Sequence, residues 1–554
     1  MRRNKYLLLG SSLGVLLLLI IAAVQENALK QWRILQASAR LGEEAIPVQL
    51  RQITNVPLRI GDRCVSCHVS MAPGEKAVTG DAILVAHKPV VHDPAEYGCT
   101  VCHGGQGSAT EKADAHGTVH FWPEPMIPLR FAQAGCGTCH NALQIPTRNT
   151  FEQASLTFDR LDCRACHRVD NRGGAIRPGG GGMEGPDLSR AGITGYDKGW
   201  YEKHLAKAEK EVAGPWKTSF GKIEETGRER VATYLSTRVA APALVEAKAM
   251  FFSFGCLGCH RVSGVGGEEG PDLSRAGEKD PGQVDFTNVA GGTAEAHPEL
   301  ASWIAEHFRS PVAVVATSQM PPVAASQKEI DALTLYVLSL RRRELPGAYV
   351  PRDRMLTTRF GHREFAADGA TLFGAFCAGC HGLEGNGKHA PDGATFPAIA
   401  NADFLALVSD DFLAGTIAKG RPGRRMPGWA KDGGLRPEEI ALVVAHVRKL
   451  GGVPEAEKAG WRVTAKPETG RDLYAASCSG CHGAKGEGGK GPALHNQALL
   501  ELASDTYLLE TIRQGRRGTA MGGFAAASPA RRSLARTEME SIVAFIRAWQ
   551  GGRK

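Results

Sequence analysis

Seven copies of one pentapeptide pattern carry the chemistry that this sequence offers. Each copy reads Cys-x-x-Cys-His, and together the seven use all 14 cysteines of the 554-residue chain. In this pattern two thiols form thioethers to a porphyrin and the adjoining histidine binds its iron, which is the attachment of a c-type haem. A zinc ribbon or a thioredoxin-like pair also uses Cys-x-x-Cys, but neither accounts for a histidine after every pair and no leftover thiol. The sequence therefore predicts seven covalently bound haem c groups with iron.

The motif residues divide into porphyrin-holding cysteines and iron-binding histidines, and the haems are numbered 1 to 7 in chain order. The cysteines are Cys64, Cys67, Cys99, Cys102, Cys136, Cys139, Cys163, Cys166, Cys256, Cys259, Cys377, Cys380, Cys478 and Cys481. The histidines are His68, His103, His140, His167, His260, His381 and His482.

Histidine is the expected sixth ligand of the first three haems. Their motifs crowd into residues 64–140, so the three haems must lie close together, as electron hopping requires. A second imidazole on a haem iron gives a low-spin carrier of low reduction potential. Four histidines outside the motifs stand within this stretch as candidate ligands: His87, His92, His116 and His120.

Methionine is the expected sixth ligand of haems 5, 6 and 7. Met320, Met426 and Met521 each follow a haem motif and precede the last helix expected in their repeat, where a loop would bring them over the haem. Methionine also serves as core filler, but two of these three are followed by proline in a polar loop, which is unusual for a core. A thioether raises the reduction potential relative to a second imidazole, so electrons are expected to run from the N-terminal haems toward the C-terminal ones.

Haem 4 departs from this pattern. Thr218-Ser219-Phe220 stands where the next repeat has its methionine, and Met183 and His204 are weaker substitutes. We expect one of the four upstream histidines to cross over to this iron, and His120 is the one to test. A vacant iron with His204 or Lys217 above it would instead indicate a haem enzyme of the peroxidase or nitrogen-oxide reductase type.

The elements that position these ligands follow from the spacing of the motifs. The three-haem cluster, residues 61–147, is expected to be rich in loops. After His167 the haem histidines follow at intervals of 93, 121 and 101 residues, each long enough for one small helical cytochrome domain. The predicted fold class is mainly α. The expected tandem domains span residues 148–241, 242–345, 362–452 and 466–550.

Each tandem segment ends in an amphipathic helix with an aromatic-sized residue at a matching place. These residues are Tyr234, Tyr336, His446 and Phe545, so His446 is interpreted as a packing residue and not as a ligand. Proline-containing linkers are expected between the later domains, one of them carrying the charged run 352–354.

The N-terminus is expected to anchor the chain in a membrane. Residues 1–5 are basic, and residues 6–24 form an uncharged, largely apolar run just long enough to cross the hydrocarbon as a helix. The flanking charges place residues 1–24 as a cytoplasmic tip and anchor, and the haem domains in the periplasm of a bacterial inner membrane. Residues 25–60 are expected to form a helical stalk. A cleaved signal peptide is the alternative, but no good small-x-small site follows Ile21.

The charge balance excludes a nucleic-acid partner. The formal charge is +8, but seven haems would bring fourteen propionates and make the loaded protein acidic.

The chain resembles a known family of membrane-anchored multihaem cytochromes c. Residues 25–141 look like those associated with bacterial cytochrome b/quinol-oxidising complexes, and residues 148–550 look like tandem class I cytochrome c domains. The N-terminal likeness rests on residues 51–53, 62–68, 98–105 and 115–117, which read Arg-Gln-Ile, Asp-Arg-Cys-Val-Ser-Cys-His, Gly-Cys-Thr-Val-Cys-His-Gly-Gly and Ala-His-Gly.

The resemblance implies an electron-transfer subunit without substrate chemistry of its own. Electrons would leave a membrane quinol-oxidising module, cross the three-haem cluster and exit to a soluble cytochrome c or a terminal acceptor. The rival readings are the haem enzyme open at haem 4 and a multihaem conduit for extracellular electron transfer.

Overall fold

The computed structural model describes residues 2–41, 44–71, 85–87, 90–119, 122–170, 172–173, 185–193, 196–211, 223–289, 299–389, 395–455, 460–529 and 531–551. The chain divides into two compact units. The first contains residues 1–141, 275–318 and 334–355, and the second contains residues 142–274, 319–333 and 356–554. The segment expected to form the haem 5 domain contributes to both units.

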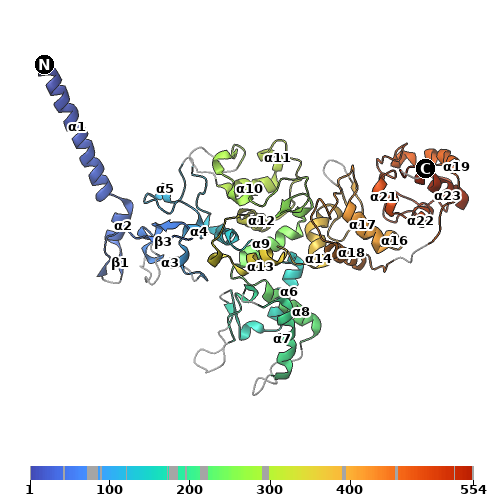
Figure 1. The fold of residues 1–554 in the computed structure, drawn as a ribbon, viewed down its shortest axis with the longest axis horizontal. Helices are drawn as coiled ribbons and strands as arrows, with labels where there is room; N and C mark the ends of the chain where they lie inside the picture. The colour runs from blue at the N-terminus through green and yellow to red at the C-terminus, as the bar shows by residue number, and fades with distance from the viewer. Residues whose placement is uncertain are drawn as a thin grey trace. The chain divides into compact units, whose positions relative to one another are not determined.

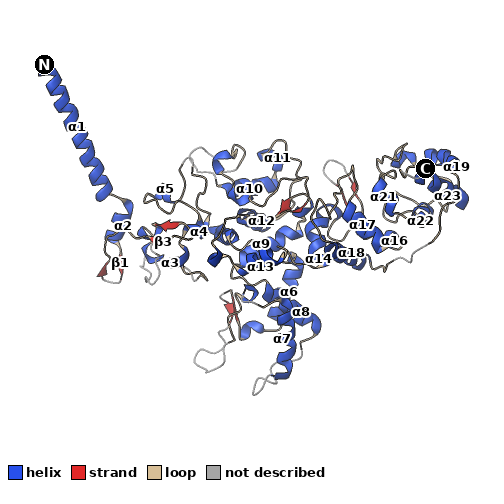
Figure 2. Ribbon diagram, viewed as in Figure 1, coloured by secondary structure: helices blue, strands red, loops and turns tan. Residues whose placement is uncertain are grey.

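The described chain is mainly helical, which confirms the expected fold class. Its strands form only two-stranded antiparallel hairpins, with two or three residues in each strand (Figure 2). The hairpins are β1–β2 (Arg40–Leu41, Glu44–Ala45), β3–β4 (Ile53–Asn55, Ile60–Asp62), β5–β6 (Arg168–Val169, Arg172–Gly173), β7–β8 (Arg261–Val262, Val265–Gly266) and β9–β10 (Lys388–His389, Thr395–Phe396).

The first unit begins with helix α1 (Arg2–Asn27), drawn in dark blue in Figure 1. The most apolar 18 residues of this helix have a mean hydropathy of 2.7 and none of them is buried, so α1 is long and apolar enough to cross a membrane. The helix does not continue into the expected stalk. It stops at Asn27, and α2 (Gln31–Ser38) is followed by the first two hairpins, so residues 25–60 are only partly helical.

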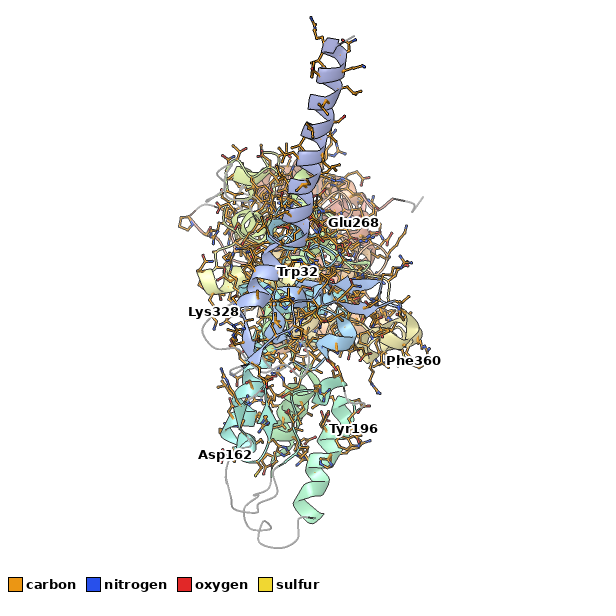
Figure 3. The ribbon with its side chains drawn as sticks, turned by 90° about the vertical axis from the view of Figure 1, so that its left-hand side faces the viewer. Trp32, Asp162, Tyr196, Glu268, Lys328 and Phe360 are labelled. Atoms are coloured by element: carbon orange, nitrogen blue, oxygen red, sulfur yellow. The ribbon has the colours of Figure 1, made fainter. Side chains whose placement is uncertain are left out.

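Helix α2 packs onto the haem 1 motif. Trp32, labelled in Figure 3, is 6% exposed. The buried Gln36 side chain donates a hydrogen bond to the Ser66 carbonyl at 2.8 Å and accepts one from the Gln49 backbone N–H at 2.8 Å. The segment after the apolar helix is therefore tied to the first haem site.

The rest of the first unit consists of short helices joined by loops, as expected for a haem cluster. Its helices are η1 (Cys64–Ser66), η2 (Val69–Met71), α3 (Pro94–Tyr97), α4 (Thr100–His103), α5 (Lys112–Ala115), η4 (Leu129–Thr138), η9 (Ala276–Glu278), η10 (Pro281–Gln283), α10 (Leu300–Arg309), α11 (Pro311–Val314) and η11 (Gly347–Tyr349). Helices α12 (Gln327–Ser339) and α13 (Arg352–Phe360) run across the division between the units.

The second unit holds the haem 4, 6 and 7 segments and the haem 5 motif. Its helices are α6 (Arg148–Arg160), η5 (Cys163–Ala165), η6 (Ala191–Ile193), α7 (Lys198–Glu211), α8 (Glu225–Ser236), α9 (Pro242–Ser253), η8 (Cys256–Gly258), α14 (Gly369–Leu372), η12 (Phe373–Cys377), α15 (Ala378–His381), α16 (Ala402–Leu405), α17 (Asp410–Lys419), α18 (Pro437–Gly451), α19 (Pro467–Ser477), α20 (Ser479–His482), α21 (Gln497–Leu502), α22 (Asp505–Gln514) and α23 (Arg536–Arg547).

Three segments of this unit share one packing scheme, in which the helix before the haem motif crosses the last helix. The crossing pairs are α6 with α8, α14 with α18 and α19 with α23. Ring contacts fill each crossing: Phe158–Tyr234 at 4.7 Å, Phe373–His446 at 5.4 Å and Tyr474–Phe545 at 5.4 Å between centroids. His446 thus packs where the other segments place an aromatic ring.

Glycine permits two of these crossings. A Cβ on Gly369 would lie 2.4 Å from the Leu442 carbonyl oxygen, and one on Gly470 would lie 2.0 Å from the Ser541 carbonyl oxygen. The helix backbones can approach this closely only because neither residue carries a side chain.

Candidate haem sites

Each haem motif forms a single helical turn that gathers its three reactive side chains. The backbone N–H of the motif histidine donates to the carbonyl of the first cysteine, at 2.8 Å in haem 1 (His68–Cys64) and at 2.9 Å in haem 5 (His260–Cys256). Residues three and four apart lie on the same face of a helical turn. The two thiols and the imidazole therefore point to one side, as attachment to a single porphyrin requires.

The motif histidines of haems 4 to 7 are held in one tautomer by a proline carbonyl. A carbonyl only accepts, so Nδ1 must carry the proton, which leaves the Nε2 lone pair for iron. Burial lowers the pKa of His260 and of His381 and keeps both rings neutral. The Nδ1 to oxygen distances are 3.0 Å for His167–Pro186, 2.9 Å for His260–Pro271, 2.8 Å for His381–Pro397 and 2.9 Å for His482–Pro492.

A glycine precedes the proline in three of these four sites. A Cβ at Gly185, Gly270 or Gly491 would lie 2.5 to 2.7 Å from an atom of the neighbouring imidazole. Only glycine lets the chain pass this close to the ring while the proline carbonyl meets Nδ1. This contact explains the Gly-Pro pairs that recur after the haem motifs.

In the first unit, each of the three motif histidines faces one of the histidines expected to be sixth ligands. The ring centroids of His68 and His116 are 6.4 Å apart, with an angle of 21° between the ring planes. The corresponding values are 6.1 Å and 69° for His103 with His87, and 6.1 Å and 22° for His140 with His92. His120 lies outside the described residues.

These spacings fit a haem iron between two imidazoles. A metal–imidazole bond is about 2.0 Å long. The centre of a five-membered ring with bonds of about 1.33 Å lies about 1.1 Å from each ring atom. Two rings on opposite sides of one metal should thus have centroids about 6.2 Å apart. Burial lowers the pKa of His103 and of His116, which favours the neutral rings that a metal needs.

The loop that carries His116 is fixed by backbone hydrogen bonds on both sides. The Gln106 N–H donates to the Ala115 carbonyl at 2.9 Å, and the Met126 N–H donates to the His116 carbonyl at 2.9 Å. Gly105 has φ +84°, and a Cβ there would lie 2.5 Å from the Ala115 carbonyl oxygen. The glycines after the second motif therefore allow a tight passage of backbone against backbone.

Neighbouring motifs touch one another directly. The Cys64 and Cys99 side chains interact directly, which lowers the pKa of Cys64 and raises that of Cys99, so the haem 1 and haem 2 attachment sites lie together. A Cβ on Gly135 would collide with the Cys102 carbonyl oxygen, so the haem 3 motif packs on the haem 2 motif. In the second unit, the Cys259 and Cys380 side chains of the haem 5 and haem 6 motifs interact directly, which raises the pKa of Cys259 and lowers that of Cys380.

Buried Asp62 joins the first two motifs. It stands two residues before Cys64, and its carboxylate accepts hydrogen bonds from the backbone N–H groups of Cys99 and Thr100, at 2.5 and 2.8 Å, and from the Thr100 hydroxyl at 2.8 Å. This role of Asp62 was not predicted from the sequence. An acidic residue just before one haem motif does not indicate that its carboxylate will accept hydrogen bonds from the backbone of the next motif.

The three expected methionine ligands lie in loops before the last helix of their segments. Met320 precedes α12, Met426 precedes α18 and Met521 precedes α23, and all three are half-buried. The loops of Met426 and Met521 are built alike. The N–H groups of Arg421 and Arg516 donate to the carbonyls of these methionines at 2.9 and 2.7 Å.

The side chains of these two arginines brace the same loops. Arg421 donates to the Thr416 hydroxyl at 2.9 Å, and Arg516 donates to the Thr511 hydroxyl at 2.5 Å. Neither arginine was predicted from the sequence. The signal was available, because Gly-Arg stands five residues before the methionine in each repeat.

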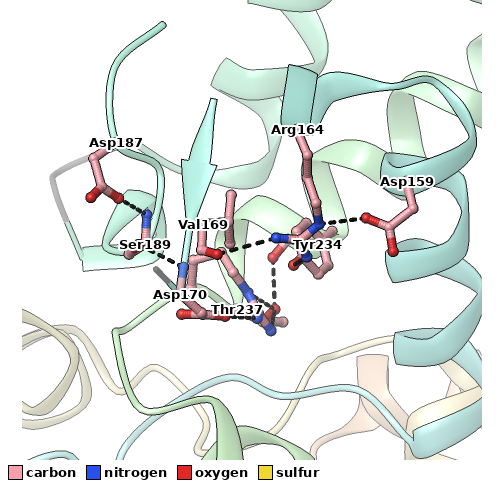
Figure 4. Close-up of polar contacts among 9 residues, drawn as sticks. Asp159, Arg164, Val169, Asp170, Asp187, Ser189, Tyr234 and Thr237 are labelled. Atoms are coloured by element: carbon pink, nitrogen blue, oxygen red, sulfur yellow. Dashed lines mark hydrogen bonds and ion pairs between the residues drawn. The ribbon is translucent and has the colours of Figure 1, made fainter. Parts of the chain in front are cut away.

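The haem 4 segment has the helix order and the proximal histidine contact of its neighbours. Arg164, between its two cysteines, donates to Asp159 at 2.6 Å, to the Val169 carbonyl at 3.1 Å and to the Tyr234 hydroxyl at 2.7 Å (Figure 4). The exposed His204 stacks on Trp200 with centroids 4.6 Å apart, much as His307 stacks on Trp303 at 5.1 Å. Met183, Lys217 and residues 218–220 lie outside the described residues.

Family comparisons match three of the four tandem segments. Residues 244–341 and 366–451 match the model for cytochrome c, and residues 465–546 match the model for subunit III of the cbb3-type cytochrome c oxidase. These three segments are therefore cytochrome c domains in tandem. Cytochrome c domains hold covalently bound haem c, and the motif geometry above fits that cofactor.

Curated relatives of this cytochrome are cbb3-type cytochrome c oxidase subunits. FixP of Bradyrhizobium sp. is 30% identical over 198 residues, which cover 34% of this chain and 62% of FixP. CcoP of Rhodobacter capsulatus is 28% identical over 197 residues, which cover 33% of this chain and 62% of CcoP. The cytochrome therefore spans less than two thirds of the length of these relatives.

Among solved structures, the cytochrome matches a chain of the reducing HAO-like protein complex of Kuenenia stuttgartiensis. The match has a TM-score of 0.23 and 20% identity, and it covers 33% of this chain and 94% of that chain. A similarity of this size carries no argument about fold or function.

Proposed function

We propose that this cytochrome carries seven haems and conducts electrons from a membrane quinol-oxidising module, through a bis-histidine cluster, to histidine/methionine haems and a periplasmic acceptor. It has no substrate chemistry of its own in this proposal. The observation that carries it is the set of three imidazole pairs, each spaced for one iron, in the unit that also holds the apolar helix α1.

The ligand assignments follow from these pairs and from the methionine loops. His116 serves haem 1, His87 serves haem 2 and His92 serves haem 3. Met320, Met426 and Met521 serve haems 5, 6 and 7. For haem 4, a histidine from the upstream four stays the prediction from the sequence, and His120 lies outside the described residues.

Ligand type supports the direction of electron flow. Imidazole on both faces favours the ferric iron and a low potential, whereas a thioether favours the ferrous iron and a high potential. The bis-histidine haems lie in the unit with the membrane-type helix, and the methionine loops belong to the C-terminal segments. Electrons entering from the membrane side would therefore move downhill.

Motif contacts support the path. The cysteine sulfurs attach to one edge of each porphyrin, so touching sulfurs bring porphyrin edges together. The interaction of Cys259 with Cys380 would bring haems 5 and 6 together in this way. Arg425, beside Met426, pairs with Glu269 at 3.0 Å and secures this contact.

The proposed partners are a membrane cytochrome b or quinol-oxidising complex and a soluble cytochrome c or other terminal acceptor. The relatives support a place in a membrane complex, since they are named as oxidase subunits. The proposed location is the bacterial inner membrane, with α1 as a single anchor and the haem domains in the periplasm.

Purification in mild detergent tests the proposal. Intact mass should show seven haem additions, and a co-purifying cytochrome b complex should reduce the cytochrome when quinol is added. A redox titration should then resolve a low-potential set of three haems. Replacing His87, His92 or His116 should each remove one haem from this set. The proposed direction would be contradicted if the bis-histidine haems had higher potentials than the histidine/methionine haems. It would also be contradicted if only a soluble donor reduced the protein.

A further inference from the structure

The segment between the haem 5 and haem 6 domains was expected to be a linker, yet residues 347–354 belong to the haem cluster. The Tyr349 hydroxyl accepts a hydrogen bond from the Asn55 amide at 2.8 Å. Its ring meets Tyr97 edge to face, with centroids 5.6 Å apart, and Tyr97 lies 4.5 Å from His92. This side of the segment thus supports the ring on one face of haem 3.

The other face of haem 3 meets the same segment. Asp353, in the first turn of α13, lies with Oδ1 3.1 Å from Nδ1 of His140. The two side chains are 9% and 11% exposed, so solvent screens their interaction only weakly. A carboxylate accepts, so Nδ1 of His140 donates and Nε2 is left for iron.

This carboxylate distinguishes haem 3 from the haems of the second unit. The motif histidines of haems 4 to 7 donate to neutral proline carbonyls. Nδ1 of His103, in haem 2, is buried without a hydrogen-bond partner among the described residues. An anionic acceptor draws the Nδ1 proton more strongly than a carbonyl, which makes the imidazole a stronger donor to its metal.

We propose that Asp353 is a positioning residue that lowers the reduction potential of haem 3 below the value that a neutral acceptor on His140 would give. The inference rests on the proposed ligation of haem 3 by His140 and His92. The stronger imidazole donor and the nearby negative charge both stabilise ferric iron over ferrous iron when one electron is exchanged. Tyr349 and Asp353, four residues apart, support the two axial ligands from one short segment.

The test is Asp353→Asn in the full-length, haem-loaded protein. The amide keeps the size of the side chain and removes its charge. The potential of one bis-histidine haem should rise by at least about 59 mV. For one electron this rise corresponds to a tenfold change in the redox equilibrium constant. The iron–imidazole stretch in the resonance Raman spectrum of that haem should weaken with it. Asp353→Glu keeps the carboxylate and should therefore keep much of the low potential of haem 3.

Matched variants separate this effect from general loss of charge or structure. Glu299→Gln removes one carboxylate from the same unit, where Glu299 pairs with Arg130 at 2.9 Å, and should leave all three potentials unchanged. Unchanged potentials in Asp353→Asn, with haem content and low-spin spectra intact, would overturn the inference. If haem 3 of the unaltered protein lacks a bis-histidine spectrum, the proposed ligation fails instead.

Discussion

Removing the three facing histidines one at a time gives the sharpest test of the haem cluster. The variants are His116→Ala, His87→Ala and His92→Ala. The ring centroids of each pair are 6.1 to 6.4 Å apart, so an iron midway between them would lie about 3.1 Å from the distal ring centre. Alanine would leave no side-chain atom that could reach it. Each variant should therefore convert one haem from low spin to a form open to carbon monoxide.

The size of the effect follows from the count of haem motifs. Each variant should bind one equivalent of carbon monoxide per seven motif-bound haems in the ferrous protein. His204→Ala is the control, because His204 is exposed, stacks on Trp200 and faces no motif histidine in the described structure. It should bind no more carbon monoxide than the unaltered protein.

The angles between the imidazole planes make the three variants distinguishable. The two imidazole planes proposed for haem 1 are inclined by 21° and those for haem 3 by 22°, so each pair is close to parallel. Parallel imidazoles make the two in-plane directions at iron inequivalent, and each ferric haem should therefore give a rhombic EPR signal. The rings of haem 2 are steeply inclined, at 69°, which makes these directions nearly equivalent and should give a strongly axial signal. His87→Ala should delete the axial signal, whereas His92→Ala and His116→Ala should each delete a rhombic one.

Two outcomes would refute this reasoning. If none of the three variants binds carbon monoxide, the facing histidines are not ligands. If His87→Ala removes a rhombic signal and leaves the axial one, the pairing of histidines with haems is wrong.

Three further predictions concern the tandem domains. Met426→His should lower the potential of haem 6 toward that of the bis-histidine set, and a titration that leaves the high-potential set intact would exclude Met426 as a ligand. Burial lowers the pKa of His446, so at mildly acidic pH the unfolded chain binds a proton that the folded chain does not. The stability of the haem 6 domain should therefore fall as the pH drops below about 6.5, the ordinary pKa of histidine. His446→Phe should remove that dependence in thermal unfolding followed at the haem absorbance. Gly470→Val should force α19 and α23 apart against Ser541 and cost about 1–3 kcal/mol of haem 7 domain stability, and an unchanged melting temperature would contradict this packing.

The expected mainly α fold was correct because motif spacing and helical patterns are local properties. The helical stalk over residues 25–60 was wrong, since patterning did not reveal the helix end at Asn27 or the two hairpins that follow. The linker expected around residues 346–354 was also misread. Its prolines and charges suggested a linker, but Tyr349 packs on Tyr97 and Asp353 contacts His140.

The sequence by itself determined which residues can attach haem, because the two thiols and the imidazole of each motif come together within one turn of chain. Only the tertiary structure decided which histidine faces which motif. His116 faces His68 although His87 and His92 are closer to it in sequence, because backbone hydrogen bonds from Gln106 and Met126 fix the His116 loop. Contacts such as that of Asp353 with His140, 213 residues apart, depend on how distant segments fold together, and no local pattern encodes them.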